Sequence, residues 1–305
     1  MIRAVHMTRR FGPVTAVDDV SFEIERGSVA GFLGPNGAGK TTAMRMLAGV
    51  LQPTSGTAFI HGFDVLQQAR EAHRVLGWLP DGAPACEELR VDEYLRFRGG
   101  LYGGIPRQRY EQVCGQCGLL DVRRRLVGQL SRGYRQRVAL AAAIVPNPVA
   151  IILDEPGTGL DPIQQLAFRS LVRELAQERA ILLSTHQVGE AMAMCDELLV
   201  IVGGKLLVQG PIDSLRQSNA AQAALLVEVK NIDVLLVLGG VDGVQSVRVK
   251  ELANGWSQAT CDCTSDIRVA VYDAITAAGG HLRELRHADT STEDWLRGLL
   301  EGTQA

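Results

Sequence analysis

The sequence predicts an α/β protein with two domains, a large one built on a sheet covered by helices and a small α+β one that follows it. Up to about residue 210, short β-branched runs alternate with amphipathic helical stretches, which is the pattern of a helix-covered sheet. A glycine-rich phosphate-binding motif lies between one of these strands and the next helix. The alternation restarts on a smaller scale from about Ala221. Together these three observations define the predicted fold class.

The composition is that of an ordinary globular protein. The chain has 305 residues, 46% hydrophobic and 21% charged, which is enough to bury the cores of two domains. A net charge of −3 does not suggest a protein built to coat nucleic acid. The first residues, MIRAVHMTRRF, lack the apolar segment of a signal peptide, and no run reaches the roughly 18 apolar residues of a spanning helix. We therefore expect a cytoplasmic protein.

The six cysteines do not resemble the disulfide framework of a small secreted domain, and the cytosol would keep them reduced. Cys114 and Cys117 form a CxxC at the end of an expected helix, and Cys261 and Cys263 alternate within an expected strand. Neither pair supplies four metal ligands or lies at a strand-to-helix turn. We expect buried, small apolar residues, with metal or redox use as the weaker alternative.

Four apolar runs are the strand candidates of the large domain, residues 28–34, 149–155, 180–185 and 197–204. The stretch from Ala83 to Gly128 interrupts this rhythm, because it shows helical periodicity only. We interpret it as a helical insertion, which together with the alanine-rich helix after it forms a helical subdomain over about residues 83–145. The large domain is expected to span residues 1–216.

The remaining residues, 217–305, are expected to form the small domain. After a polar, alanine-rich segment, the pattern indicates the order β-α-β-β-α-β, closed by a helix within STEDWLRGLLEG, residues 291–302. This order is that of a ferredoxin-like domain. Such domains bind small ligands, dimerise or brace a neighbour, so the fold alone does not assign a role.

The motif GPNGAGKTT follows an apolar strand and precedes a helix. From Gly34 to Thr41 it matches G-x-x-x-x-G-K-[ST], whose glycines let backbone amides face a β-phosphate while the helix dipole adds positive potential. We expect Lys40 to bridge the β- and γ-phosphates and the Thr41 hydroxyl to bind Mg²⁺. The predicted nucleotide-binding residues of the loop are Gly34, Pro35, Asn36, Gly37, Ala38, Gly39, Lys40, Thr41 and Thr42.

Two acids end the apolar run AIILDEP. Asp154 at the strand end can hold the hydration shell of Mg²⁺, and Glu155 lies one residue farther, where its carboxylate can polarise an attacking water. A lone Asp-Glu pair more often simply ends a strand. The phosphate loop in the same chain favours the catalytic interpretation.

The stretch LSRGYRQRV, residues 130–138, precedes the alanine-rich helix. Ser131 can cap this helix and offer its hydroxyl to a phosphate, and Gly133 permits close backbone approach. Three arginines, Arg132, Arg135 and Arg137, add positive potential. Taken alone, the stretch is more typical of a capped helix with a solvated arginine face, and only the neighbouring motifs favour the functional interpretation.

The order of the motifs is more specific than any one of them. LSRGYRQRV comes shortly before LDEP, and TGLD and STH follow. This ordered set resembles the ATPase subunits of ABC transporters, over residues 1 to about 216. The resemblance implies a P-loop ABC ATPase domain with a RecA-like core, an antiparallel β subdomain and a helical subdomain, and it implies ATP and Mg²⁺ as cofactors.

The resemblance also carries roles to single positions. Ser131 and Gly133 match the signature loop, which closes over the ATP bound to the opposing subunit. Asp161 in TGLD matches the loop that links the two active sites, and His186 in STHQ matches the switch histidine that contacts the γ-phosphate. Phe11 is similar in position to the aromatic ring that stacks on adenine, with a core phenylalanine as the alternative.

Several positions depart from the usual family pattern. Asp81 replaces a glutamine that ligates Mg²⁺ and senses the membrane partner, so its metal contact is expected to pass through water. Arg132 and Tyr134 replace glycine and glutamine, and Gly157 replaces threonine. The form S-x-G-Y-R-Q-R resembles the branch of gliding-motility, drug-resistance and sodium exporters, in which ATPase and membrane subunits are separate chains.

These resemblances imply an ATPase that sandwiches two ATP molecules, as a homodimer or with a homologous ATPase, and powers transport through a separate transmembrane permease. Export follows from the branch resemblance only, and we expect the chain to lie peripherally on the inner face of the cell membrane. The helical insertion is expected to receive a cytoplasmic helix of the permease through Tyr94, Phe97 and Tyr102, although a self-contained core could also use these residues.

Two alternatives stay open. A soluble ABC ATPase acting on nucleic acid or ribosomes generally has two ATPase modules or a long coiled coil, and the sequence shows neither, so we expect no nucleic-acid partner. A degenerate, regulatory nucleotide binder is faintly suggested by Asp81. The intact Lys40, Asp154, Glu155 and His186 argue against it.

Overall fold

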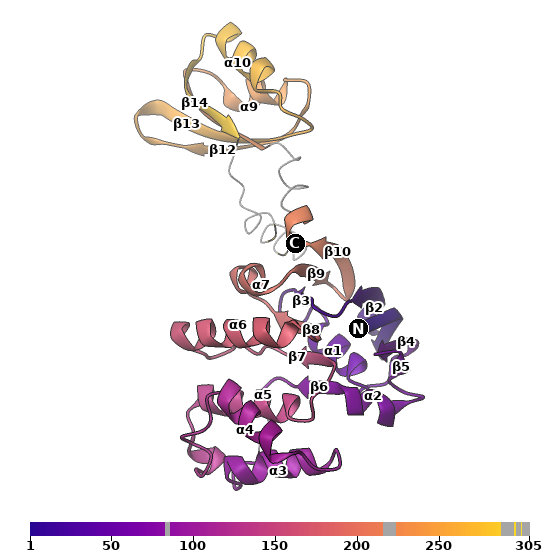
Figure 1. Ribbon diagram of the computed structural model, residues 1–305. Helices are drawn as coiled ribbons and strands as arrows, with labels where there is room; N and C mark the ends of the chain where they lie inside the picture. The colour runs from indigo at the N-terminus through magenta and orange to yellow at the C-terminus, as the bar shows by residue number, and fades with distance from the viewer. Residues whose placement is uncertain (83–85, 216–223, 288–295, 297–299, 301–305) are drawn as a thin grey trace. The chain divides into compact units, whose positions relative to one another are not determined.

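The computed structural model describes residues 1–82, 86–215 and 224–287, together with Leu296 and Leu300 (Figure 1). The chain divides into two compact units, Met1–Ile212 and Asp213–Ala305, which are described separately below. The expected domain boundary between residues 216 and 217 lies outside the described residues.

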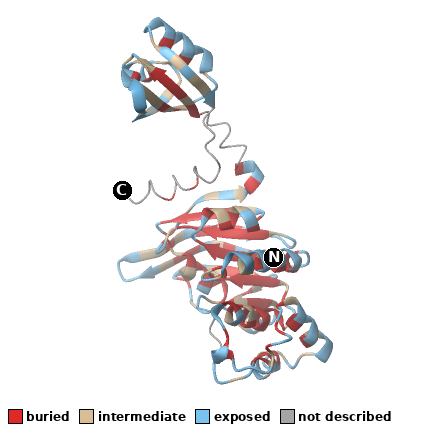
Figure 2. Ribbon diagram, turned by 90° about the vertical axis from the view of Figure 1, so that its left-hand side faces the viewer, coloured by how far each residue is buried: buried red, intermediate tan, exposed pale blue. Residues whose placement is uncertain are grey.

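A six-stranded sheet forms the centre of the larger unit. Its strand order is β10-β9-β3-β8-β7-β6, parallel throughout except for the antiparallel pair of β9 and β10. The central strands are buried on both faces, which explains their continuous apolar runs (Figure 2). The strands are β3 (Val29–Leu33), β6 (Leu76–Leu79), β7 (Ala150–Leu153), β8 (Ala180–Thr185), β9 (Glu197–Val202) and β10 (Lys205–Pro211).

Helices and a second sheet cover this central sheet. Helix α1 (Lys40–Leu47) and the antiparallel sheet β2-β1-β4-β5 share one core with alternate residues of β3, β7, β8 and β9. On the opposite face α5 (Arg132–Ile144) packs very closely, since a Cβ at Gly77 of β6 would lie 2.6 Å from the Ala143 carbonyl oxygen. The remaining elements of this part are β1 (Ile2–Phe11), β2 (Val14–Ile24), β4 (Ser55–Ile60), β5 (Phe63–Asp64), α2 (Ala69–Val75), α6 (Pro162–Ala176) and α7 (Val188–Met194).

The expected helical insertion is present between β6 and β7. It contains α3 (Val91–Gly100), α4 (Arg107–Gln116), a short 3-10 turn (Val127–Gln129) and α5 (Arg132–Ile144). Cys114 lies in α4 and Cys117 is its C-cap, and both thiols are buried, as expected for small apolar residues. Burial raises the pKa of Cys117 to about 12, so this thiol stays protonated and unreactive.

Between residues 224 and 287 the smaller unit has its strands and α-helices in the predicted order: β11 (Ala224–Lys230), α9 (Val234–Gly239), β12 (Val244–Glu251), β13 (Trp256–Cys263), α10 (Arg268–Ala277) and β14 (His281–His287), with a short 3-10 turn (Ala253–Gly255) between β12 and β13. Its antiparallel sheet has the order β12-β13-β11-β14. One core lies between sheet and helices, and Cys261 and Cys263 contribute to it as buried residues. The closing helix expected within residues 291–302 lies outside the described residues, except for the helical Leu296 and Leu300.

Candidate active site

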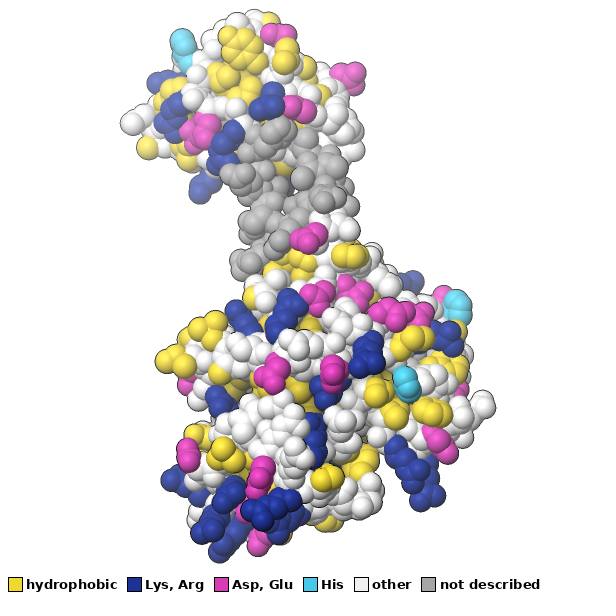
Figure 3. Space-filling model, viewed as in Figure 1, with side chains coloured by type: hydrophobic (Ala, Val, Ile, Leu, Met, Phe, Trp, Pro, Cys, Tyr) yellow, Lys and Arg dark blue, Asp and Glu magenta, His cyan; other side chains and the backbone are white. Residues whose placement is uncertain are grey.

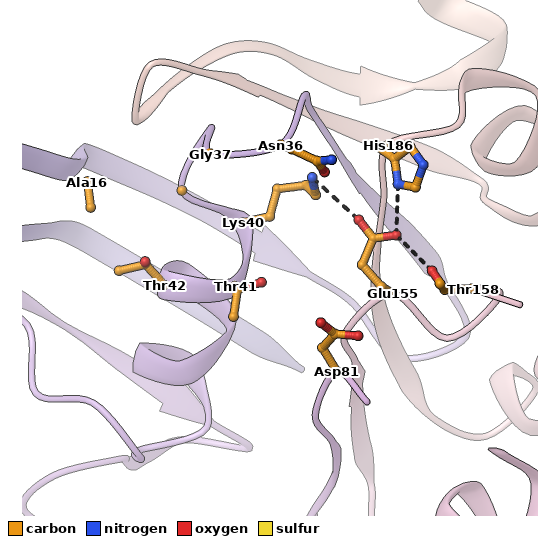
Figure 4. A pocket seen from close by; sticks show the side chains of 11 residues that line it. Ala16, Asn36, Gly37, Lys40, Thr41, Thr42, Asp81, Glu155, Thr158 and His186 are labelled. Carbon is orange, nitrogen blue, oxygen red and sulfur yellow. Dashed lines mark hydrogen bonds and ion pairs between the residues drawn. The ribbon is translucent and has the colours of Figure 1, made fainter. Parts of the chain in front are cut away.

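The phosphate loop joins β3 to α1 and lines a pocket of about 380 Å³ (Figure 4). Two glycines let the backbone curl, with φ of 81° at Gly37 and 105° at Gly39. At Gly39 a Cβ would lie 2.2 Å from the Ala16 carbonyl oxygen, so both conformation and space require glycine there. The lining residues are Ala16, Asn36, Gly37, Gly39, Lys40, Thr41, Thr42, Asp81, Glu155, Thr158 and His186.

Lys40 places a fixed positive charge at the start of α1. Its side chain is only 6% exposed, and its Nζ donates to the carbonyl oxygens of Gly34 at 2.8 Å and Pro35 at 3.2 Å. The same Nζ lies 3.4 Å from Glu155 Oε1. The phosphate loop therefore holds the ammonium group in place, and that group also forms an ion pair with the Glu155 carboxylate.

Asp154 follows β7 and is 1% exposed. Its Oδ1 accepts from Ser184 Oγ at 2.6 Å and from Thr41 Oγ1 at 3.4 Å. Its Oδ2 is buried without a hydrogen-bond partner among the described residues. Burial raises the pKa of Asp154, and the negative charges of Asp81 and Glu155 raise it further.

An orphaned carboxylate oxygen beside a threonine hydroxyl fits a hard divalent cation, because oxygen ligands are what Mg²⁺ prefers. Bound Mg²⁺ would compensate Oδ2 and offset the burial of the Asp154 charge. Asp81 is exposed and lines the same pocket. The residues present therefore fit the metal, and Thr41 and Asp154 are the residues that would hold it.

Glu155, just after β7, contacts both Lys40 of the phosphate loop and His186 (Figure 4). Its Oε2 lies 3.0 Å from His186 Nδ1 and accepts from Thr158 Oγ1 at 3.4 Å, while its Oε1 faces Lys40. Its φ is 46°, a left-handed conformation that is uncommon outside glycine and often marks functional sites. Its backbone N–H donates to Ser184 Oγ at 2.8 Å.

Three residues that the resemblance assigns to ATP binding lie outside the lining of this pocket. Ser131 is the N-cap of α5, and its Oγ accepts from the Tyr134 amide at 3.4 Å. Gly133 allows close packing, since a Cβ there would lie 2.2 Å from Gln164 Oε1. Asp161 caps α6, with Oδ1 accepting from the Gln164 amide at 2.8 Å. None of Ser131, Gly133 and Asp161 is among the residues that line the pocket.

Phe11 is 46% exposed, and the Arg9 guanidinium carbon lies 4.6 Å from the centroid of its ring. The alternative that Phe11 is a core residue is therefore wrong. An exposed ring at the end of β1 is free to take a stacking partner, although Phe11 is not among the pocket-lining residues.

Two buried polar residues that the sequence analysis did not name as site residues complete the site. Ser184 contacts both carboxylate residues, as described above. Gln136 of α5 donates from Nε2 to the Pro156 carbonyl oxygen at 2.9 Å, which ties the signature helix to the peptide next to Glu155. Ser184 is the first residue of STH and Gln136 lies within LSRGYRQRV, so the motifs that pointed to their neighbours were the signal that could have found them.

The fold and the pocket define a nucleotide-hydrolysing P-loop ATPase. The family model described as "ABC transporter" matches residues 17–158. NatA of Bacillus subtilis (strain 168), an ABC transporter ATP-binding protein, is 38% identical over 73% of this chain and 94% of its own length. The daunorubicin resistance ATP-binding protein DrrA3 of Streptomyces coeruleorubidus is 32% identical over 94% of this chain and 88% of its own length.

Solved structures agree with these relatives. An ATP-binding subunit of an ABC transporter is similar at a TM-score of 0.67 and 27% identity, over 72% of this chain and 93% of that one. The dimeric bacterial cassette MJ0796 is similar in fold at a TM-score of 0.63 and 21% identity, over 70% of this chain and 99% of its own. The chain therefore belongs to the ATP-binding proteins of ABC transporters, which hydrolyse ATP to power transport.

Proposed function

We propose that two copies of this chain, or this chain and a homologous ATPase, enclose two Mg²⁺-ATP molecules and power export through a separate membrane permease. One observation carries the proposal. The loop, acid and histidine groups surround one pocket, whereas Ser131 caps a helix that does not line it. A serine presented at a positive helix N-terminus is suited to a γ-phosphate, and a second subunit would supply that phosphate.

The dimer gains support from one solved relative, because MJ0796 is described as a dimeric cassette. If ATP is shared between the Lys40 loop of one subunit and Ser131 of the other, ATP binds the closed dimer better than the separate subunits. Hydrolysis then removes this difference in affinity. The cycle of closing and opening is the mechanical output that a permease would use.

Within each pocket the chain's own groups have separable tasks. The Lys40 ammonium is expected to exchange Glu155 for phosphate oxygens, which frees the carboxylate to orient and deprotonate water. His186 stays within hydrogen-bond distance of the same carboxylate and can hold it in place. Thr41 and Asp154 would hold Mg²⁺, with Asp81 contributing through water, and the ion would supply positive charge against the phosphates.

The helical insertion offers a surface for the permease. Phe97 and Leu101 of the α3 region are 57% and 62% exposed, whereas Tyr94 is buried in the insertion's own core and Tyr102 is half-buried. Phe97 is thus exposed, as a contact with the permease requires, whereas Tyr94 belongs to a self-contained core and Tyr102 is intermediate. We propose that Phe97 and Leu101 contact a cytoplasmic helix of the permease, since exposed apolar neighbours are typical of interaction sites.

Charge on the same insertion fits a position beside the membrane. Lys and Arg side chains gather where α3 and α4 lie (Figure 3). The exposed arginines of this region include Arg96, Arg107, Arg124 and Arg125. Such residues are attracted to the anionic cytoplasmic leaflet, which supports a peripheral position on the inner face of the membrane. None of the helices in the described part of the chain combines the length and apolar character needed to cross a membrane.

The test is to trap the complex and identify what accompanies it. The Glu155→Gln variant, tagged and loaded with ATP and Mg²⁺, is purified from its native membranes in mild detergent and analysed by mass spectrometry. Recovery of a multi-span protein supports the export proposal and identifies the permease. Recovery of ribosomal, nucleic-acid-bound or only soluble components would instead favour the soluble ABC ATPase.

A further inference from the structure

A single buried hydroxyl connects the two acids of the active site. Ser184 lies near the end of β8, is 0% exposed and has no direct access to the pocket. Its Oγ donates to Asp154 Oδ1 at 2.6 Å and accepts from the Glu155 backbone N–H at 2.8 Å. A serine hydroxyl has one proton and two lone pairs. Ser184 uses the proton on Asp154 and one lone pair on the next residue, Glu155.

The donated hydrogen bond fixes how the Asp154 carboxylate is turned. Because Oδ1 is held by Ser184 and more weakly by Thr41, the partner-free Oδ2 is the oxygen left for a cation. Loss of the Ser184 bond would let the carboxylate rotate, and the cation would lose a preoriented ligand.

The accepted hydrogen bond acts on the backbone of the catalytic glutamate. Glu155 has a φ of 46°, which a residue with a side chain adopts only where its surroundings stabilise it. The Ser184 oxygen stabilises this peptide from the adjacent strand. The Glu155 carboxylate reaches both Lys40 and His186 from that backbone position.

We propose that Ser184 is a positioning residue for hydrolysis, whose hydroxyl sets the Asp154 carboxylate toward the metal and the Glu155 carboxylate toward the attacking water. The inference deepens the proposed function, because it concerns the same ATP site. It requires the hydroxyl itself rather than the volume of the side chain. A purely structural serine would also be buried and hydrogen-bonded, so the test must separate these roles.

The decisive comparison is Ser184→Thr with Ser184→Val. The two replacements have nearly the same shape, so any packing strain is shared, and only threonine keeps a hydroxyl. We expect Ser184→Val to lower kcat for ATP by roughly 10- to 100-fold, the usual effect of losing a residue that orients a metal ligand. Ser184→Thr should retain within about threefold of the wild-type kcat, and exposed Ser170→Ala serves as the control.

Two further readouts are independent of turnover by the loaded enzyme. Affinity for Mn²⁺ in the presence of a non-hydrolysable ATP analogue, measured by electron paramagnetic resonance, should fall in Ser184→Val and not in Ser184→Thr. Thermal unfolding establishes that each variant is folded at the assay temperature. In the Glu155→Gln background, Ser184→Val should reduce the residual turnover less than it reduces wild-type turnover, because only the effect that acts through Asp154 remains.

Equal kcat losses in the threonine and valine variants would overturn the proposal, because volume rather than the hydroxyl would then matter. An increase in KM with unchanged kcat and Mn²⁺ affinity would also overturn it. If this chain hydrolyses ATP normally but no permease co-purifies with it, the export proposal is contradicted, while the assignment of Ser184 stays intact.

Discussion

Replacing Gln136 with leucine should remove the hydrogen bond that ties α5 to the loop after β7. The Gln136 side chain is 8% exposed, and its Nε2 donates to the Pro156 carbonyl oxygen at 2.9 Å. Leucine has a similar volume but leaves that buried carbonyl without this donor, which costs about 1–3 kcal/mol. For a unit of this size each kcal/mol lowers the melting temperature by about 2–4 °C, so we expect a decrease of roughly 2–12 °C.

The same change should also lower turnover, because Pro156 follows Glu155 directly and the helix that carries Ser131 no longer fixes it. Differential scanning calorimetry and steady-state ATPase assays measure the two effects, with exposed Gln177→Leu as the matched control. A melting temperature within 1 °C of the wild type, together with unchanged kcat, would refute the role assigned to this hydrogen bond.

Three further results are expected. Lys40→Ala should abolish turnover without unfolding the protein, as measured by phosphate release and circular dichroism; substantial residual turnover would contradict its role. Phe97→Asp should reduce co-purification of the permease but leave the melting temperature unchanged, since this ring is 57% exposed; unfolding would place Phe97 in the core. The raised pKa of Asp154 means that the folded state binds its proton more tightly than the unfolded state. Without Mg²⁺, stability should therefore fall as pH rises from the usual aspartate pKa through the raised one. In Asp154→Asn, the melting temperature should depend less on pH over this range. An unchanged slope of melting temperature against pH would contradict the raised pKa of Asp154.

Strands buried on both faces were predictable because they must be continuously apolar. The expected runs 180–185 and 197–204 correspond to β8 (Ala180–Thr185) and β9 (Glu197–Val202). Strand β6 was missed, since four residues with Gly77 in their midst carry no strand periodicity. Its place in the sheet follows from packing against β7 and α5, which are distant in the sequence.

The residues of the site also fall into those that the sequence could nominate and those that only the structure brings together. Lys40, Thr41 and Glu155 occur in short motifs whose spacing contains their chemistry, so the sequence could nominate them. Ser184 is 29 residues from Glu155 and contacts it only because β7 and β8 are neighbours in the sheet. Gln136 depends similarly on how α5 packs beside the loop after β7. Their roles follow from tertiary distances, which local pattern does not encode.

Two departures from the usual family pattern have a common physical reason in the loop between Glu155 and Asp161. At Gly157 a Cβ would lie 1.8 Å from Glu190 Oε1, so the Glu190 carboxylate takes the space of the usual threonine side chain. Its Oε2 accepts from Thr185 Oγ1 at 2.5 Å, next to His186. Arg132, in place of glycine, lies against Gly159, where a Cβ would be 2.5 Å from its Nε. Long charged side chains from α5 and α7 thus shape both halves of this loop. Threonine at position 157 would collide with the Glu190 carboxylate unless that side chain moved, and glycine at position 132 would remove the side chain that packs against Gly159.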